Sequence, residues 1–537
     1  MRTWSLVALA LGLIVAFACP LLASAAPAAG ADAAKAAADH AAHAHHGVDG
    51  SIIPLWMVIP FLGILLSIAV MPLVIPHFWH HHFGKVSAFW AVVGAALMFF
   101  FPDFKSSDVF YELAHVMLLD YVPFVILLLG LFTIAGGIRI KGTLRGSPKL
   151  NTFMLIIGWF LASFMGTTGA SMLMIRPMIQ ANAWRERKAH LIIFFIFLVS
   201  NMGGALTPLG DPPLFLGFLR GVDFTWPLEH LHKEALVGTG ILLVLFFILD
   251  TIMLSKEKTK TPPADAPVQP VTATIKTRHT KVLSKDAIAA PAPSPVAPAN
   301  EKFGIEGGIN FVLLALLIGA ILGSVQVKGD LHLSDGLPGI PYTNLIRDAA
   351  ILVLAIVSLK VTSKESRRLN GFTWAPIQEV AKLFAGIFIC MVPALKILGA
   401  GTHGQLADVI QAVSDPVTGD PVNWRYFWLT GALSSFLDNA PTYLVFFNTA
   451  AGEHALLPAP AAAQFMMGEK MVPTLAAISC GAVFMGANTY IGNAPNFMVK
   501  AIAEESGIKM PSFFGYMAWS VLILIPVFIL LTFLFFV

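Results

Sequence analysis

The chain has 537 residues, of which 57% are hydrophobic and only 12% are charged. Soluble domains average roughly 45–50% apolar and about 25% charged residues, so this composition indicates a polytopic membrane protein. A formal net charge of +3 is too small to indicate nucleic-acid binding, and three cysteines are too few for a disulfide framework.

The N-terminus has the pattern of a secretory signal. Arg2 precedes an apolar run from Leu6 to Leu22, and Ala23-Ser24-Ala25 is typical of a cleavage site. We predict a signal peptide over residues 1–25, with an uncleaved first helix as the alternative. Residues 26–51 are rich in Ala and His and cannot build a core, so we expect a tail. Its candidate weak metal ligands are His40, His43, His45 and His46.

Apolar runs long enough to cross a bilayer follow along the chain. A hydrocarbon core about 30 Å thick needs about 20 helical residues. The predicted runs are 52–75, 87–101, 114–136, 189–220, 234–254, 304–327, 345–360, 376–398, 472–502 and 512–537.

Two further apolar stretches, 150–182 and 424–451, have polar centres at Gly166-Thr167-Thr168-Gly169 and Asp438-Asn439-Ala440-Pro441-Thr442. Basic residues lie on both sides of the first stretch. If both basic loops are cytoplasmic, the stretch enters and leaves the membrane on one side, as a re-entrant hairpin. The basic residues that support this topology are Arg139, Lys141, Arg145, Lys149, Arg185, Arg187 and Lys188. The same rule places the N-terminal tail outside.

A Pro- and Ala-rich segment over residues 255–303 is predicted to be a cytoplasmic linker. It separates a first membrane repeat, 52–254, from a second, 304–537. Each half is predicted to contain three helices, a re-entrant hairpin, a broken helix and a final helix. Because five crossings invert the second copy, the expected fold is an all-α polytopic membrane protein with two inverted-topology repeats.

A repeated motif marks the two broken helices. The segment Gly204-Ala-Leu-Thr-Pro-Leu-Gly-Asp-Pro-Pro-Leu-Phe215 returns as Gly486-Ala-Asn-Thr-Tyr-Ile-Gly-Asn-Ala-Pro-Asn-Phe497, with six of twelve positions identical. Each copy places Gly, Pro, Thr and Asp or Asn within a hydrophobic stretch. Paired interruptions of this kind point to the binding site of a secondary transporter.

Two carboxylates fall within these membrane segments, Asp438 at a hairpin tip and Asp211 in a helix break. An unpaired intramembrane carboxylate is costly, so both are candidate functional groups. The alternatives are an ion pair or helix cap for Asp438 and turn chemistry for Asp211. Nearby side chains offer the oxygen ligands that small hard cations prefer, unless they only satisfy freed backbone groups. They are Asn201, Thr207, Asn439, Thr442, Asn488, Thr489, Asn493 and Asn496, with Thr167 and Thr168 at the first hairpin.

Four basic residues lie in or near apolar runs: Arg176, Arg347, Lys382 and Lys396. We expect most of them to extend their charged ends toward the membrane surface. An ion pair between Lys382 or Lys396 and an acidic residue is the alternative.

The hairpin tip at Asp438 and the two Gly-(Asp/Asn)-x-Pro breaks resemble the ion-transporter superfamily, which includes NhaD-type sodium/proton antiporters, arsenite permeases and citrate transporters. The resemblance covers the chain from about residue 52 onward. It implies a homodimer in which hairpins and broken helices form a transport domain that moves like an elevator against a fixed scaffold. The dicarboxylate branch typically has Ser-Asn-Thr at its hairpin tips, a pattern absent at Gly166-Thr167-Thr168 and Asp438-Asn439-Ala440.

We therefore predict a secondary transporter of a bacterial-type cytoplasmic membrane: a sodium/proton antiporter in which Asp438, with Asp211, binds a cation or protons in turn. The alternatives are a symporter for citrate-like anions or metal citrate, and a non-transporting membrane sensor. The expected partners are lipid and small ions or a small anion, without nucleic acid. We find no phosphate loop or nucleophile with its base, and expect neither a resident cofactor nor enzyme activity.

Overall fold

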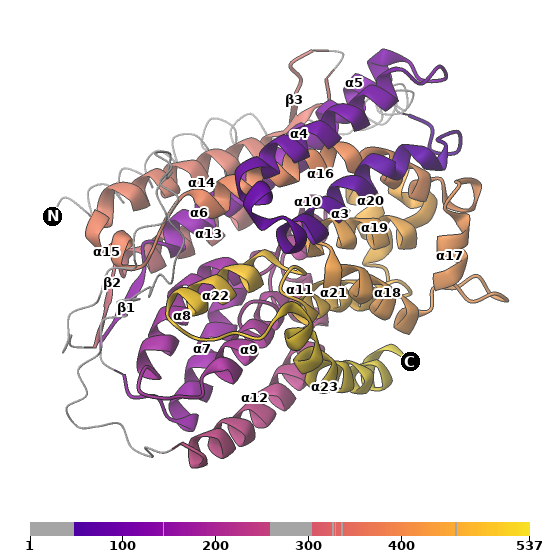
Figure 1. Cartoon of the computed structure of the whole chain (residues 1–537). Coiled ribbons are helices and arrows are strands. Elements are labelled where there is room, and N and C mark those ends of the chain that lie inside the picture. The colour runs from indigo at the N-terminus through magenta and orange to yellow at the C-terminus, as the bar shows by residue number, and fades with distance from the viewer. Residues whose placement is uncertain are drawn as a thin grey trace, which may run out of the picture.

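The computed structural model describes residues 48–142, 144–257, 303–324, 327, 329–334, 337–456 and 459–537 (Figure 1). The predicted signal peptide, the four histidines of the tail and most of the linker lie outside the described residues. The described part is predominantly helical, and seven of its helices are long and apolar enough to cross a membrane. The protein is an all-α polytopic membrane protein, as its composition predicted.

The first half consists of helices that follow the predicted apolar runs closely. They are η1 (Leu55–Val58), α3 (Ile59–Val74), α4 (Pro76–Phe99), α5 (Ser106–His115), η2 (Val116–Tyr121), α6 (Val122–Ala135), α7 (Pro148–Met165), α8 (Thr167–Ala181), α9 (Ala189–Leu198), η3 (Met202–Ala205), α10 (Pro212–Leu219), α11 (Trp226–His230) and α12 (His232–Ser255). The segment η2 is a π-helix that joins α5 to α6 without a break.

The chain after the linker also consists mainly of helices. They are α13 (Ile309–Ser324), α14 (Tyr342–Val361), α15 (Lys364–Leu369), α16 (Ala375–Gly399), η4 (Gly401–His403), α17 (Ala407–Val413), α18 (Asn423–Phe436), α19 (Asn439–Ala451), η5 (Gly452–Leu456), α20 (Ala459–Met466), α21 (Val472–Met485), η6 (Gly486–Asn488), α22 (Ala494–Glu505), α23 (Phe513–Leu531) and η7 (Thr532–Phe536).

Two short antiparallel strand pairs accompany the helices. Strand β1 (Arg139–Lys141) pairs with β2 (Gly304–Glu306), and β3 (Asp330–Leu331) pairs with β4 (Ile340–Pro341). Because β1 follows α6 and β2 precedes α13, the first pair joins the two halves of the chain. Glu306 bonds Arg139 at 3.0 Å and Lys141 at 3.1 Å across it.

Two predicted helix boundaries differ clearly from the structure. The run expected over 114–136 begins earlier, at Ser106 of α5. The second apolar run was expected from residue 87, whereas α4 begins at Pro76. The four histidines after the first run, His77, His80, His81 and His82, therefore lie in the first turns of α4. Because these residues are polar, the hydropathy pattern placed the start of the helix too far along the chain.

The helices pack in two groups. In the first, α4 contacts α3 and α16, and α14 contacts α6 and α13. In the second, α7 packs on α8, α9 and α12, and α18 packs on α19 and α21. Figure 1 shows α4, α14 and α16 in the upper part, with α7, α8, α9 and α12 below them. The groups meet where α16 contacts α19 and α6 contacts α8.

A buried polar cluster holds the ends of α7, α8, α9 and α12 together. Asp250 of α12 accepts hydrogen bonds from Asn151 and His190, each at 2.9 Å, and pairs with Arg185 at 2.6 Å. Asn182 exchanges hydrogen bonds with Asn151. All five side chains are at most 3% exposed. Arg185, which the sequence suggested only as part of a basic loop, is a structural residue.

Two of the four basic residues in or near the apolar runs have acidic partners among the described residues. Lys396 of α16 forms an ion pair with Glu112 of α5, which is the alternative that the sequence left open. Arg347 is 3% exposed and donates to Asp348 at 2.9 Å.

Candidate functional site

Four helix N-termini meet around Asp211. Asp211 is the N-cap of α10, Asp438 is the N-cap of α19, and Asn493 is the N-cap of α22. The fourth, α8, begins at Thr167. Proline lies in the first turn of α10 and α22, where its fixed φ suits the helix and its missing N–H is not needed. The sequence thus starts a new helix at each break.

The carboxylate of Asp211 is the centre of the hydrogen-bond network. It accepts from Thr167 Oγ1 at 3.0 Å, from Asn439 Nδ2 at 2.8 Å and from Asn493 Nδ2 at 3.1 Å. These partners come from both hairpins and from the second broken helix. Asp211 is 1% exposed, and none of the described basic residues forms an ion pair with it. Among the described residues, the buried carboxylate therefore has hydrogen-bond donors but no cationic partner.

Three oxygens converge on the amide nitrogen of Asn493. They are Asp211 Oδ1 at 3.1 Å, the Ser200 carbonyl at 3.1 Å and Asn201 Oδ1 at 3.3 Å. An NH₂ group has two hydrogens, so it cannot satisfy all three acceptors at once. Asn201 in turn donates to Asn496 Oδ1 at 2.7 Å. The site therefore has more oxygen acceptors than donors around one position.

The two threonines of the repeated motif make matching contacts. Thr207 donates to the Ser163 carbonyl, and Thr489 donates to the Ser435 carbonyl. Ser163 and Ser435 each lie three residues before the hairpin tips, Gly166 and Asp438. Each threonine hydroxyl also accepts from the backbone N–H two residues later, at 3.2 Å. These threonines fix each break to its hairpin and do not contact Asp211.

Asp438 lies next to this network and differs from Asp211 in its contacts. Its side chain accepts from the Ala440 backbone N–H at 3.2 Å, and it is half-buried. Thr442 donates to the Asp438 carbonyl at 3.0 Å and so belongs to the same helix start. Asn439, the residue after Asp438, donates to Asp211, so the two carboxylates belong to neighbouring helix starts. Thr168 follows Thr167 in the first turn of α8 and is half-buried.

Asn488 does not hydrogen-bond with Asp211 and instead lies beside α18 and α23. It donates to Ser435 Oγ at 2.9 Å, and its own Oδ1 has no hydrogen-bond partner among the described residues. It lines a cavity of about 190 Å³ whose walls are mostly apolar. Among the other lining residues are Trp428, Phe436, Met485, Met517 and Val521.

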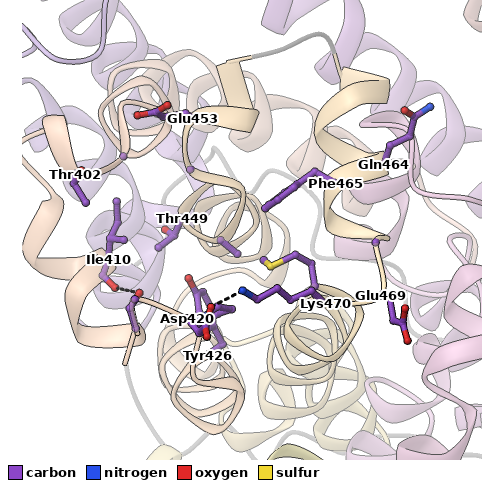
Figure 2. Close-up of a pocket in the computed structure, with 18 residues that line it drawn as sticks. Thr402, Ile410, Asp420, Tyr426, Thr449, Glu453, Gln464, Phe465, Glu469 and Lys470 are labelled. Carbon is purple, nitrogen blue, oxygen red and sulfur yellow. Dashed lines mark hydrogen bonds and ion pairs between the residues drawn. The ribbon is translucent and has the colours of Figure 1, made fainter. Parts of the chain in front are cut away.

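A separate cavity of about 610 Å³ lies at the far end of the second hairpin (Figure 2). Lys470 and Asp420 form an ion pair at 2.6 Å within it, and Thr449, Glu453 and Glu469 are also in its lining. The lining residues of this cavity do not include Asp211 or its partners. Within the described residues, no group of three or more His, Cys, Asp and Glu side chains is arranged to hold a metal.

A family model described as "Putative citrate transport" matches residues 50–536. The chain belongs to this family, CitMHS_2. The match confirms the resemblance to the ion-transporter superfamily and identifies a multi-pass membrane protein of a transporter family. Family membership is also compatible with the expectation that the chain is not an enzyme.

Mycobacterial membrane proteins are among the similar proteins. Uncharacterized transporters of Mycobacterium tuberculosis and Mycobacterium bovis are each 24% identical over 434 residues, 78% of this chain and 86% of the relative. A 46 kDa membrane protein of Mycobacterium leprae is 28% identical over 169 residues, 29% of this chain and 38% of the relative.

Proposed function

We propose that this CitMHS_2 protein is a sodium/proton antiporter with Asp211 as the carboxylate shared by the cation and the proton. The observation that carries the proposal is the convergence of Asp211, Asn201 and the Ser200 carbonyl on one amide group of Asn493. If a small cation displaced the Asn493 amide group, these three oxygen acceptors would be available to bind it.

Rotation of two amides would complete an oxygen cage. If Asn493 turns about its last side-chain bond, its Oδ1 replaces the Nδ2 and joins the three acceptors as a fourth ligand. Asn439 can do the same on the other carboxylate oxygen, because its present partner Ser434 has a second acceptor in the Ala482 carbonyl at 2.7 Å. Carboxylate, amide and backbone oxygens are the ligands that hard cations prefer.

Antiport follows from the missing counter-ion. A buried carboxylate without a cationic partner is costly, so Asp211 needs a proton or a cation to neutralise it. If only the neutralised site changes its exposure from one side of the membrane to the other, each sodium ion must exchange for protons. Asp438, whose neighbour Asn439 donates to Asp211, is the second carboxylate of the proposed site.

The alternative is transport of a citrate-like anion. Two observations favour it: the family description, and the four helix N-termini, whose partial positive charges attract anions. Asp211 and Asp438, however, already place negative charge at these N-termini, and a multiply charged anion would be repelled there. The mostly amide and hydroxyl surroundings of Asp211 are better suited to a cation.

We further propose that the halves are inverted repeats and that a homodimer moves the hairpins and broken helices as one transport unit. The matching contacts of Thr207 with Ser163 and of Thr489 with Ser435 support the repeats. The proposed topology has the N-terminal tail outside a bacterial cytoplasmic membrane and the linker inside.

Proton movement in inside-out vesicles tests the function. An acid interior is generated, and sodium, lithium, potassium or citrate is added in turn to vesicles with the wild type, Asp211→Asn or Asn448→Ala. Asn448 is a control because it is buried, bonds only the Leu444 carbonyl within the described residues and lies outside the network. Sodium should release protons in the wild type and the control but not in Asp211→Asn. Proton movement driven only by citrate would replace the antiporter with the anion transporter.

A further inference from the structure

The short helix α10 connects the proposed site to the group of helices that contains α6 and η2. It has eight residues, begins directly after Asp211 and ends at Arg220. On its N-terminal side lies the irregular break, and on its C-terminal side Gly221 makes a turn with a φ of 100°. Because neither neighbour is a regular helix, the position of α10 depends on its side-chain contacts.

An ion pair holds the C-terminal end of α10. Arg220 Nη2 lies 2.8 Å from Asp120 Oδ2, and the two side chains are 17% and 5% exposed. Asp120 belongs to the π-helix η2, and π-helical turns are frequent at functional sites. A charge-assisted hydrogen bond with so little access to water is stronger than one at the surface.

A cation–π contact holds the middle of the same helix. The guanidinium carbon of Arg347 lies 5.9 Å from the ring centroid of Phe215. Arg347 comes from α14, and its Nε is bonded to Asp348, which fixes the direction of the side chain. Burial makes such a contact stronger than at an exposed position. Two charged residues from different elements therefore contact α10 or its C-cap within three turns of Asp211.

We propose that Asp120 and Arg347 are positioning residues that hold α10 so that Asp211 stays in reach of Thr167, Asn439 and Asn493. This inference rests on the proposed cation/proton exchange at Asp211. None of the three partner contacts of Asp211 involves Asp120, Arg220 or Arg347. If α10 were held less firmly, the Asp211 carboxylate would occupy a wider range of positions. The affinity for the cation would fall, because only some of the molecules would have the carboxylate correctly placed.

The first test is the double variant Asp120→Asn with Arg220→Gln, which removes both charges and leaves neither one buried alone. We expect the KM for sodium to rise between about twofold and thirtyfold, the range of energetic coupling through a packed network, with kcat nearly unchanged. The matched control is Glu112→Gln with Lys396→Gln, which neutralises an ion pair between α5 and α16 that does not touch α10. A role in folding alone would reduce the yield of active protein without changing KM.

Phe215→Leu is a second variant in case the double variant does not fold. It removes the ring under Arg347 but keeps an apolar side chain, and its control is Phe83→Leu, which removes the ring under Lys382 away from α10. We expect a raised KM for Phe215→Leu and a wild-type KM for the control. An unchanged KM in the double variant or, if that does not fold, in Phe215→Leu would overturn the proposal.

Hydrogen exchange separates this inference from the proposed function. Residues 214–220 should exchange their amide hydrogens faster in the double variant than in the wild type and in the Glu112/Lys396 control, whereas Pro212 and Pro213 have no amide hydrogen. Unchanged exchange there overturns the positioning role, whatever the protein transports. Faster exchange together with no sodium response in the wild type would instead reject the antiporter. The positioning of α10 by Asp120 and Arg347 would then still hold.

Discussion

Asn493→Ala is the substitution whose consequences follow most directly from the site. The amide donates to the Asp211 carboxylate, the Ser200 carbonyl and Asn201 Oδ1, and its two hydrogens serve two of them at a time. While Asp211 is ionised, one bond to its carboxylate contributes about 1.5–3 kcal/mol, and one neutral bond contributes about 0.5–1.5 kcal/mol. We therefore expect the variant to lose about 2–4.5 kcal/mol of stability.

The same substitution should weaken sodium binding, because the proposed cage loses its fourth oxygen. A loss of about 1.4 kcal/mol in binding corresponds to about a tenfold rise in Kd. Thermal unfolding in detergent measures the first effect, and sodium-driven proton movement in vesicles measures the second. Asn448→Ala, which loses a single bond to the Leu444 carbonyl, is the control. If Asn493→Ala were as stable and as active as this control, the network around Asp211 would not be the site.

Three further predictions concern other parts of the structure. We expect Asp438→Asn to change stability by less than about 0.5 kcal/mol, because both residues cap helices well, but to reduce sodium-driven proton movement strongly; full activity would remove Asp438 from the site. Asp250→Ala should destabilise the protein by about 3–5 kcal/mol, because Arg185 would be buried without its partner, and an unchanged unfolding temperature would contradict this. Partial burial acts to raise the pKa of Glu306, but Lys141 and Arg139 hold it below its usual value. The contribution of Glu306 to the free energy of unfolding is thus present at neutral pH and is lost as the pH falls through the lowered pKa. Glu306→Gln should cost at most about 1 kcal/mol at neutral pH and nothing in strong acid, as pH-dependent unfolding would show.

The sequence predicted the helices well because the bilayer imposes a minimum apolar length on each one. The largest error was the start of α4, because the polar residues His77, His80, His81 and His82 lower the hydropathy of its first turns. The histidines follow Pro76, a favourable first helical residue, and this was the available signal for the earlier start.

The candidate residues were predicted from the repeated breaks and hairpin tips, but their arrangement could not be predicted. Nothing local in the sequence indicates that Asn439 and Asn493 reach Asp211, since they are more than two hundred residues away along the chain. For the same reason the cluster of Asn151, Arg185 and Asp250 was missed, because its members lie on different helices. The structure also gives Asp211 more partners than Asp438, although the hairpin tip had made Asp438 the first candidate.

Sodium-induced proton release from the purified protein tests the shared carboxylate most directly. Wild-type protein in weakly buffered detergent solution is titrated with sodium chloride while a pH indicator reports protons, with choline chloride as the ionic-strength control. We predict that sodium acidifies the wild-type solution and that Asp211→Asn gives no response beyond that to choline. Equal proton release by Asp211→Asn would contradict the central claim that sodium and protons compete for Asp211.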